Sequence, residues 1–149
     1  MNKKIIIIIA IVLIILLAVG IYFGIRINTT NKYEAADIYT VKGEEITSVK
    51  AAIGEIDLKK YSYSKGDTET LVLTFKDSNK EENATKYIQY LKDNGNYIEM
   101  RTEDTNKQQL AKSAENSEDL VTVETDIIDD GFEVIIIVGP GTIQLDAIE

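Results

Sequence analysis

The longest apolar run in the chain extends from Ile5 to Ile25 and contains 21 residues without a charged side chain. An α-helix of this length is about 32 Å long, which is enough to cross the hydrocarbon core of a bilayer, roughly 30 Å thick. We therefore predict a single transmembrane helix, with residues 1–27 forming a short cytoplasmic tip and a signal anchor.

A cleaved signal peptide is the alternative interpretation of this segment. Lys3 and Lys4 form a basic start, and Ala18-Val19-Gly20 has the small residues of a cleavage site. The apolar run nevertheless continues past that site to Ile25, which a membrane span requires and a signal peptide does not. The anchor is our prediction, and a domain secreted after cleavage stays open as the alternative.

The charges beside the span predict its orientation. Lys3 and Lys4 flank the first end closely, whereas Arg26 follows the second end. The positive-inside rule then places the amino terminus in the cytoplasm and the long C-terminal part outside the cell membrane.

The interior of the span carries one further signal. Gly20 and Gly24 lie on the same helix face, where a pair of small residues lets two spans approach closely. The pair predicts a weak span-mediated dimer. No Ser, Thr, Asn or charged residue interrupts the span, so a transport function is not expected.

Past the span, the chain changes from apolar to mixed composition. Residues 28–37 begin with the polar stretch NTTNK, and they are predicted to form a stalk. Residues 38–149 are enough for one domain with a single core, and no internal repeat divides them. We expect this extracytoplasmic domain to be of the α+β class.

Alternation of apolar and polar residues predicts strands in the first half of the domain. Residues 61–63 and 71–75 alternate on either side of Lys65-Gly66-Asp67, which indicates a hairpin with its turn at the glycine. Residues 97–100 form another short strand. The expected sheet is small and mostly antiparallel.

A second hairpin is predicted near the end of the chain. Its strands cover residues 120–128 and 132–138, and Asp129-Asp130-Gly131 supplies the turn. Residues 134–138 are continuously apolar, which is typical of a strand that is buried on both faces. The sequence Gly139-Pro140-Gly141 should end that strand.

One main helix is predicted between the two hairpins. Ser78 and Glu81 match a capping box, in which the serine caps the helix and the glutamate reaches back to it. Gly95 follows the last turn and is free to take the left-handed conformation. The helix presents one apolar face with helical spacing, formed by Ala84, Tyr87, Ile88 and Leu91.

Two segments give no single prediction. Residues 38–56 contain Ile46, Val49 and Ile53 at helical spacing before Gly54, but their β-branched side chains favour a strand or an irregular segment. Residues 103–119 fit either a short helix or a further strand that turns at 116–118.

The charge of the outer part restricts its partners. Three of the 16 basic residues lie at the span, whereas all 25 acidic residues follow it, so the outer part has a net charge near −12. Such a surface repels phosphate backbones, and nucleic-acid binding is not expected. It would attract metal cations and basic peptides.

The missing residue types argue against catalysis. The chain has no His and no Cys, which removes the commonest general base and the strongest nucleophile. No nucleophile elbow, phosphate-binding loop or dinucleotide fingerprint is present. We predict a protein that is not an enzyme and that needs no cofactor.

Five carboxylates crowd one end of the last hairpin: Glu124, Asp126, Asp129, Asp130 and Glu133. Clustered carboxylate oxygens suit Ca²⁺. The spacing differs from that of the calcium loop of an EF-hand, and Asp-Gly is a common turn pair. We therefore assign no metal site to them.

The tyrosines allow two interpretations. Tyr61 and Tyr63 alternate on a strand, and Tyr87 and Tyr90 lie on the helix, so together they could form a partner-binding face. The simpler interpretation, which we prefer, places Tyr87 in the core and packs the strand tyrosines on their neighbours.

Three stretches of the domain carry a resemblance: residues 87–95 (YIQYLKDNG), 109–113 (QLAKS) and 139–142 (GPGT). They look like segments of small signal-anchored extracytoplasmic proteins of low-GC Gram-positive bacteria. The resemblance implies a stand-alone envelope domain and supplies no catalytic residue.

These observations predict a single-pass membrane protein whose outer domain binds an envelope protein without catalysing a reaction. Binding of cations or of a basic peptide is the alternative function.

Overall fold

The computed structural model describes residues 32–143. The predicted span, its glycine pair and residues 28–31 of the predicted stalk lie outside this range. Within the range, no helix is both long and apolar enough to cross a membrane. The compact unit begins at Tyr33, inside the segment that we expected to be a stalk. The Tyr33 ring packs on the ring of Tyr61, with 4.9 Å between the centroids.

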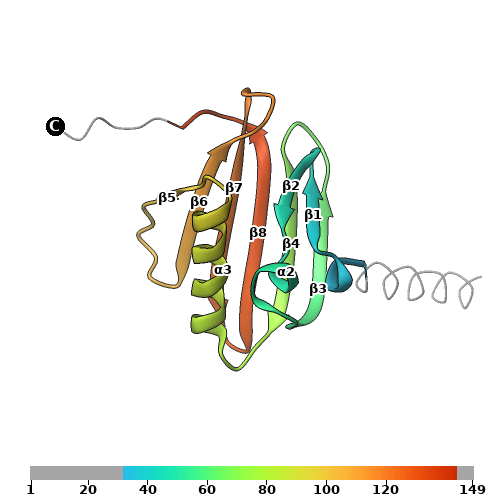
Figure 1. Ribbon diagram of the computed structural model, residues 1–149, viewed down its shortest axis with the longest axis vertical. Helices are drawn as coiled ribbons and strands as arrows, with labels where there is room; N and C mark the ends of the chain where they lie inside the picture. Colours follow the sequence, from blue (N-terminus) through green and yellow to red (C-terminus); the bar gives the residue numbers. More distant parts are fainter. Residues whose placement is uncertain (1–31, 144–149) are drawn as a thin grey trace, which may run out of the picture. The chain divides into compact units, whose positions relative to one another are not determined.

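The domain is α+β, as predicted, and its main element is a six-stranded antiparallel sheet in the order β3-β4-β8-β7-β6-β5 (Figure 1). A separate two-stranded sheet joins β1 to β2. The elements are β1 (Ile38–Val41), β2 (Glu44–Thr47), α2 (Val49–Ile53), β3 (Asp57–Ser64), β4 (Glu69–Lys76), α3 (Lys80–Asn94), β5 (Ile98–Met100), β6 (Lys107–Ser113), β7 (Asp119–Ile128) and β8 (Gly131–Pro140).

One face of the sheet is covered and the other is open. Figure 1 shows α3, α2 and the β1–β2 hairpin on the same side of the six strands. The register places Leu71 of β4 and Val123 of β7 on either side of Ile136 of β8, and all three side chains are fully buried under these elements. The core is therefore a single layer between the sheet and the elements that cover it.

The open face corrects our prediction for β8. Val134 and Ile136 are fully buried, but Ile135 and Ile137 keep partial exposure. The continuous apolar run had predicted burial on both faces. Antiparallel sheets commonly leave one face to solvent, and here no helix of the described chain covers the second face.

The apolar face of α3 is confirmed, since Ala84, Tyr87, Ile88 and Leu91 are all buried. They are spaced to meet the sheet on one side of the helix. Close packing of this face against β6, β7 and β8 supplies most of the helix's stability, because short helices are marginal alone.

The predicted capping box of α3 is wrong. Asn79 occupies the N-cap position and makes no side-chain cap hydrogen bond. The carboxylate of Asp77 instead holds the start of the helix through two hydrogen bonds. It accepts one from the backbone N–H of Asn79 at 2.9 Å and one from the side-chain amide of Asn83 at 2.7 Å. An acidic group beside the first turn also complements the helix dipole.

The first ambiguous segment, residues 38–56, folds as a hairpin followed by one helical turn. Ser48 begins α2 by accepting a hydrogen bond from the backbone N–H of Ala51 at 3.1 Å, and Gly54 ends it. The hydroxyl of Tyr39 accepts from the N–H of Val49 at 3.2 Å, and burial raises the pKa of Tyr39 to about 12. The segment therefore contains two strands and a short helix, which explains why its sequence carried both a strand signal and a helix signal.

The second ambiguous segment resolves in favour of a strand. Residues 107–113 form β6, which pairs with β7 so that Leu110 lies opposite Val123. Leu110 is fully buried. The chain turns at 114–118, where Ser117 takes a positive φ of 61°.

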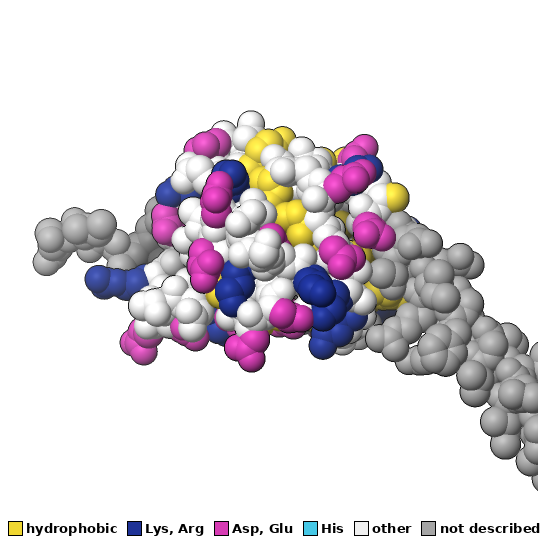
Figure 2. Space-filling view, turned by 90° about the horizontal axis from the view of Figure 1, so that it is seen from below, with side chains coloured by type: hydrophobic (Ala, Val, Ile, Leu, Met, Phe, Trp, Pro, Cys, Tyr) yellow, Lys and Arg dark blue, Asp and Glu magenta, His cyan; other side chains and the backbone are white. Residues whose placement is uncertain are grey.

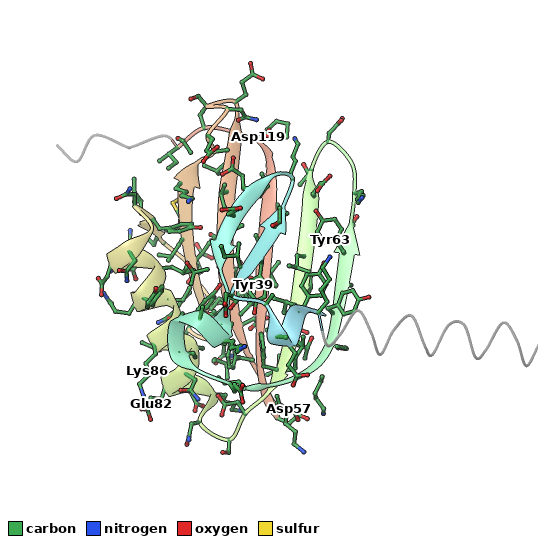
Figure 3. The ribbon with its side chains drawn as sticks, turned by 45° about the vertical axis from the view of Figure 1, so that its right-hand side comes forward. Tyr39, Asp57, Tyr63, Glu82, Lys86 and Asp119 are labelled. Atoms are coloured by element: carbon green, nitrogen blue, oxygen red, sulfur yellow. The ribbon has the colours of Figure 1, made fainter. Side chains whose placement is uncertain are left out.

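The tip of the β1–β2 hairpin is tied to the sheet by one lysine. Lys42 has a φ of 49° in the tight turn, and its ammonium lies 2.9 Å from a carboxylate oxygen of Asp119. Its backbone N–H donates to Glu69 at 2.9 Å, and the hydroxyl of Tyr63 donates to the same carboxylate. Asp119 and Tyr63 are labelled in Figure 3.

This tie predicts an acid-sensitive hairpin. The ammonium of Lys42, and secondly the amide of Asn116, lower the pKa of the Asp119 carboxyl from its usual value of 3.8. Because the folded pKa is the lower one, the stabilisation is complete above about pH 4 and is lost as the pH falls through the folded-state value. We expect urea midpoints to fall less steeply with acid in Asp119→Asn than in the wild type; parallel curves would contradict this role.

Candidate functional site

The carboxylates of the last hairpin fall into two groups. Glu124, Asp126 and Glu133 lie on the open face of the sheet, where Asp126 is paired in register with Glu133. The ammonium of Lys107 lies 3.2 Å from Glu124 and 3.7 Å from Asp126. Thr74 donates a hydrogen bond of 3.0 Å to Glu133.

The other two carboxylates lie at the turn. Asp130 forms an exposed ion pair of 2.8 Å with Lys59, and that contact lowers the pKa of Asp130. Lys80 donates to the backbone carbonyls of Ile128 and Asp129 at 2.7 and 2.8 Å. Cationic side chains of the domain itself therefore occupy this end, and residues 32–143 contain no acidic group of three placed to hold a metal ion.

The tyrosines do not form one exposed face. Tyr87 is fully buried, as predicted, and its hydroxyl donates to the carbonyl of Thr47 at 2.8 Å. Tyr61 and Tyr63 on β3 are partly buried and pack against the core. Tyr90, near the last turn of α3, is also partly buried and packs against the same core.

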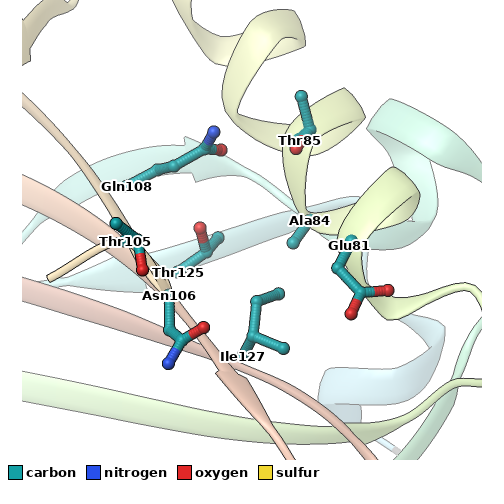
Figure 4. A pocket seen from close by; sticks show the side chains of 8 residues that line it. All are labelled: Glu81, Ala84, Thr85, Thr105, Asn106, Gln108, Thr125 and Ile127. Carbon is teal, nitrogen blue, oxygen red and sulfur yellow. The ribbon is translucent and has the colours of Figure 1, made fainter.

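A small polar pocket opens beside the first turns of α3, between the helix and the ends of β6 and β7 (Figure 4). Its volume is about 90 Å³, which suits a few water molecules. Glu81 is its only charged lining residue, and the buried Oε1 of Gln108 has no hydrogen-bond partner among the described residues. Hydration of Gln108 is a sufficient role for this space.

A larger pocket of about 190 Å³ lies at the other end of α3, and we call it the C-end pocket. The β2 strand forms one wall, and the last turn of the helix forms the opposite wall. Its lining residues are Glu45, Ile46, Thr47, Tyr90, Leu91, Asn94, Gly95, Tyr97 and Lys112.

The C-end pocket combines aromatic rings with charges of both signs. The ammonium of Lys112 lies over the Tyr97 ring, 4.8 Å from its centroid, which is a favourable cation–π position. Glu45, an exposed residue of β2, is the one acidic residue among those that line the pocket. The C-terminal carbonyls of α3 add the negative end of the helix dipole.

Tyr97 is the most unusual residue of this pocket. Its side chain is 7% exposed, and its hydroxyl has no hydrogen-bond partner among residues 32–143. Burial, and secondly the negative charge of Glu44, raise the pKa of Tyr97 well above its ordinary value. A buried phenol without a partner is costly, so this hydroxyl is a candidate for ligand recognition.

Gly95 makes room for the Tyr97 ring. A Cβ at this position would lie 2.5 Å from Cε2 of Tyr97 and 2.8 Å from the carbonyl oxygen of Leu91. The φ of Gly95 is −115°, so the predicted left-handed conformation is wrong, and Asn96 takes it instead with φ 57°. The absence of a side chain at position 95 is therefore needed to leave room for the Tyr97 ring, and not to allow an unusual backbone conformation.

Sequence reasoning missed Tyr97, Lys112 and Glu45 as a group. They come from three separate segments, and only the pairing of β5 with β6 and the docking of the β1–β2 hairpin bring them together. The one local signal was the glycine two residues before Tyr97.

Two tyrosine substitutions should have opposite effects on stability. Tyr87→Phe should cost about 1 kcal/mol, because it leaves the partly buried carbonyl of Thr47 without this donor. Tyr97→Phe should be neutral or slightly stabilising, because it removes a hydroxyl that has no partner. Urea unfolding followed by circular dichroism measures both; equal losses would show that Tyr97 has a structural hydrogen bond.

Comparison with protein-family models, with curated proteins and with solved structures finds no match to this chain. The function must therefore be argued from the residues and their geometry.

Proposed function

We propose that the chain is a non-enzymatic, single-pass membrane protein whose domain lies outside the cell membrane and binds a basic segment of an envelope protein. The net charge near −12 of the outer part carries this proposal, because it favours cationic partners over every anionic surface of the envelope. The predicted span and the resemblance to signal-anchored envelope proteins support the location.

A basic peptide fits the domain better than a metal ion. Two carboxylates of the last hairpin, Glu124 and Asp126, already contact the ammonium of Lys107. Seen from the end at which α3 begins, acidic and basic side chains are interspersed without a large patch of one sign (Figure 2). The C-end pocket, at the opposite end of the helix, combines a carboxylate with aromatic walls suited to an organic cation.

The location is tested by protease treatment of intact, wall-stripped cells. We expect the domain to be digested while cytosolic markers survive, and the residual fragment to keep Met1 and the span. A domain that resists until the cells are lysed would place it in the cytoplasm. Recovery of most of the domain from the medium, beginning at Ile21, would favour the secreted alternative.

The binding activity is tested with the full chain in detergent micelles. A lysine- and arginine-containing peptide should release or absorb measurable heat at low salt, and its affinity should fall as salt is added, because exposed charges are screened. A peptide of the same length with glutamate at the basic positions is the control. Equal binding of both peptides, or none of the basic one, would refute the proposed function.

A further inference from the structure

We infer that the C-end pocket is the receptor for one lysine or arginine side chain of the partner, and that Lys112 occupies its aromatic face until the partner displaces it. This inference rests on the proposed function and assigns the basic segment to a single place on the domain.

The position of Lys112 shows that the ring of Tyr97 accepts a cation on its face. Its ammonium lies over the ring of Tyr97 at 4.8 Å, and no ion pair within residues 32–143 joins it to a carboxylate. An exposed cation–π contact is weak. A partner cation that also reaches a carboxylate can therefore replace it.

The partner cation would find negative groups that Lys112 does not pair with. Glu45 lies in the β2 wall, and the field of Glu44 reaches the Tyr97 hydroxyl. The last carbonyls of α3 give the helix end a partial negative charge. An ammonium or guanidinium donates to such oxygens, and only a donor suits all of them at once.

The apolar wall matches the stem of the same side chain. Ile46, Leu91 and the ring of Tyr90 line the space between β2 and α3. Lysine and arginine bury their methylene groups along apolar surfaces while the charged head reaches polar groups.

The C-end pocket by itself has the size of a site for one side chain. Sites for small molecules of cofactor size enclose roughly 300–1,000 Å³, whereas the C-end pocket encloses about 190 Å³. An open hollow of about 420 Å³ adjoins it, sharing Gly95 and Lys112, and it leads to Ile98, which is 42% exposed. An extended peptide can follow this hollow while one side chain enters the pocket.

If a partner cation displaces Lys112, then removing the lysine ammonium should raise the affinity for a basic peptide. Lys112→Gln should tighten binding of a basic peptide about three-fold or more, because it removes the internal competitor from the ring. Glu45→Gln should weaken binding by a similar factor. Both positions are at least partly exposed, so both variants should fold, which circular dichroism and urea midpoints check.

Matched controls separate the pocket from general charge effects. Lys86→Gln and Glu82→Gln make the same charge changes in an exposed ion pair nearer the start of α3 (Figure 3). We would titrate the full chain in detergent micelles into a fluorescein-labelled nonapeptide of Gly and Ser with one central arginine, and into the same peptide with norleucine at that position.

The outcomes are distinct. Larger effects at Lys112 and Glu45 than at Lys86 and Glu82, together with loss of binding for the norleucine peptide, support the pocket. Equal effects at both pairs overturn it and leave a charge-driven partner-binding function standing. Failure of multiply basic peptides to bind the wild type at low salt overturns both the pocket and the proposed function.

Discussion

Gly131→Ala should lower the free energy of unfolding by about 3 kcal/mol or more, or prevent folding. Gly131 begins β8 opposite Lys76 of β4. A Cβ on Gly131 would lie 1.8 Å from the carbonyl oxygen of Phe75 and 2.8 Å from its carbonyl carbon. Both atoms belong to the backbone of a central strand, so no side-chain rotation can relieve the contact, and β4 and β8 would have to separate.

Gly66→Ala is the matched control, since it makes the same change in the other predicted hairpin turn. The nearest atom to a Cβ at Gly66 is the carbonyl oxygen of Thr68 at 3.6 Å, an ordinary contact. Urea unfolding followed by circular dichroism should show a midpoint close to that of the wild type for Gly66→Ala only. Similar midpoints for the two variants would mean that β4 and β8 are less closely apposed than described.

Leu91→Ala should cost roughly 2–5 kcal/mol, the usual range for deleting a buried leucine side chain. Leu91 is 2% exposed and belongs to the same core cluster as Leu110 and Val121 of the sheet beneath α3. Because it also lines the C-end pocket, its removal should enlarge that pocket and weaken the hold on a partner side chain.

The exposed position Gln89 on the same helix provides the control for Leu91. Gln89→Ala removes only a surface contact with Asp93, and its effect should stay within about 0.5 kcal/mol. If both variants unfold at the same urea concentration, the assignment of the buried face of α3 is wrong.

Local periodicity was sufficient to predict the elements that repeat a pattern over many residues. The spacing of Ala84, Tyr87, Ile88 and Leu91 identified the core face of α3, and the structure confirms it. The hairpin of β3 and β4 and that of β7 and β8 followed from alternation and glycine turns in the same way. Each of these signals lies within the element that it predicts.

Periodicity failed where the decision depended on distant residues. The run from Val134 to Val138 does not say whether a second layer covers Ile135, and here none of the described elements does. The spacing of Ser78 to Glu81 predicted Ser78 as the cap, but the carboxylate of Asp77 orders the start of the helix with Asn79 in the N-cap position.

The candidate site could not be predicted from the sequence, because it too depends on residues that are far apart in the chain. Glu45 comes from a hairpin that was itself ambiguous, and Lys112 comes from a segment that fitted a helix as well as a strand. Their proximity to Tyr97 depends on the order β7-β6-β5 at one edge of the sheet and on the docking of β2. No spacing rule encodes that arrangement.

The strand order also determines when the domain can fold during its production. β8 lies between β4 and β7 in the middle of the sheet, yet it is the last strand of the described chain. A chain that emerges from the ribosome amino end first exposes the unpaired inner edges of β4 and β7 until residues 131–140 arrive. Such long-range pairing is slow and leaves apolar edges open to aggregation. The sheet should therefore stay incomplete until residues 131–140 have been made, and the domain should depend on chaperones up to that point.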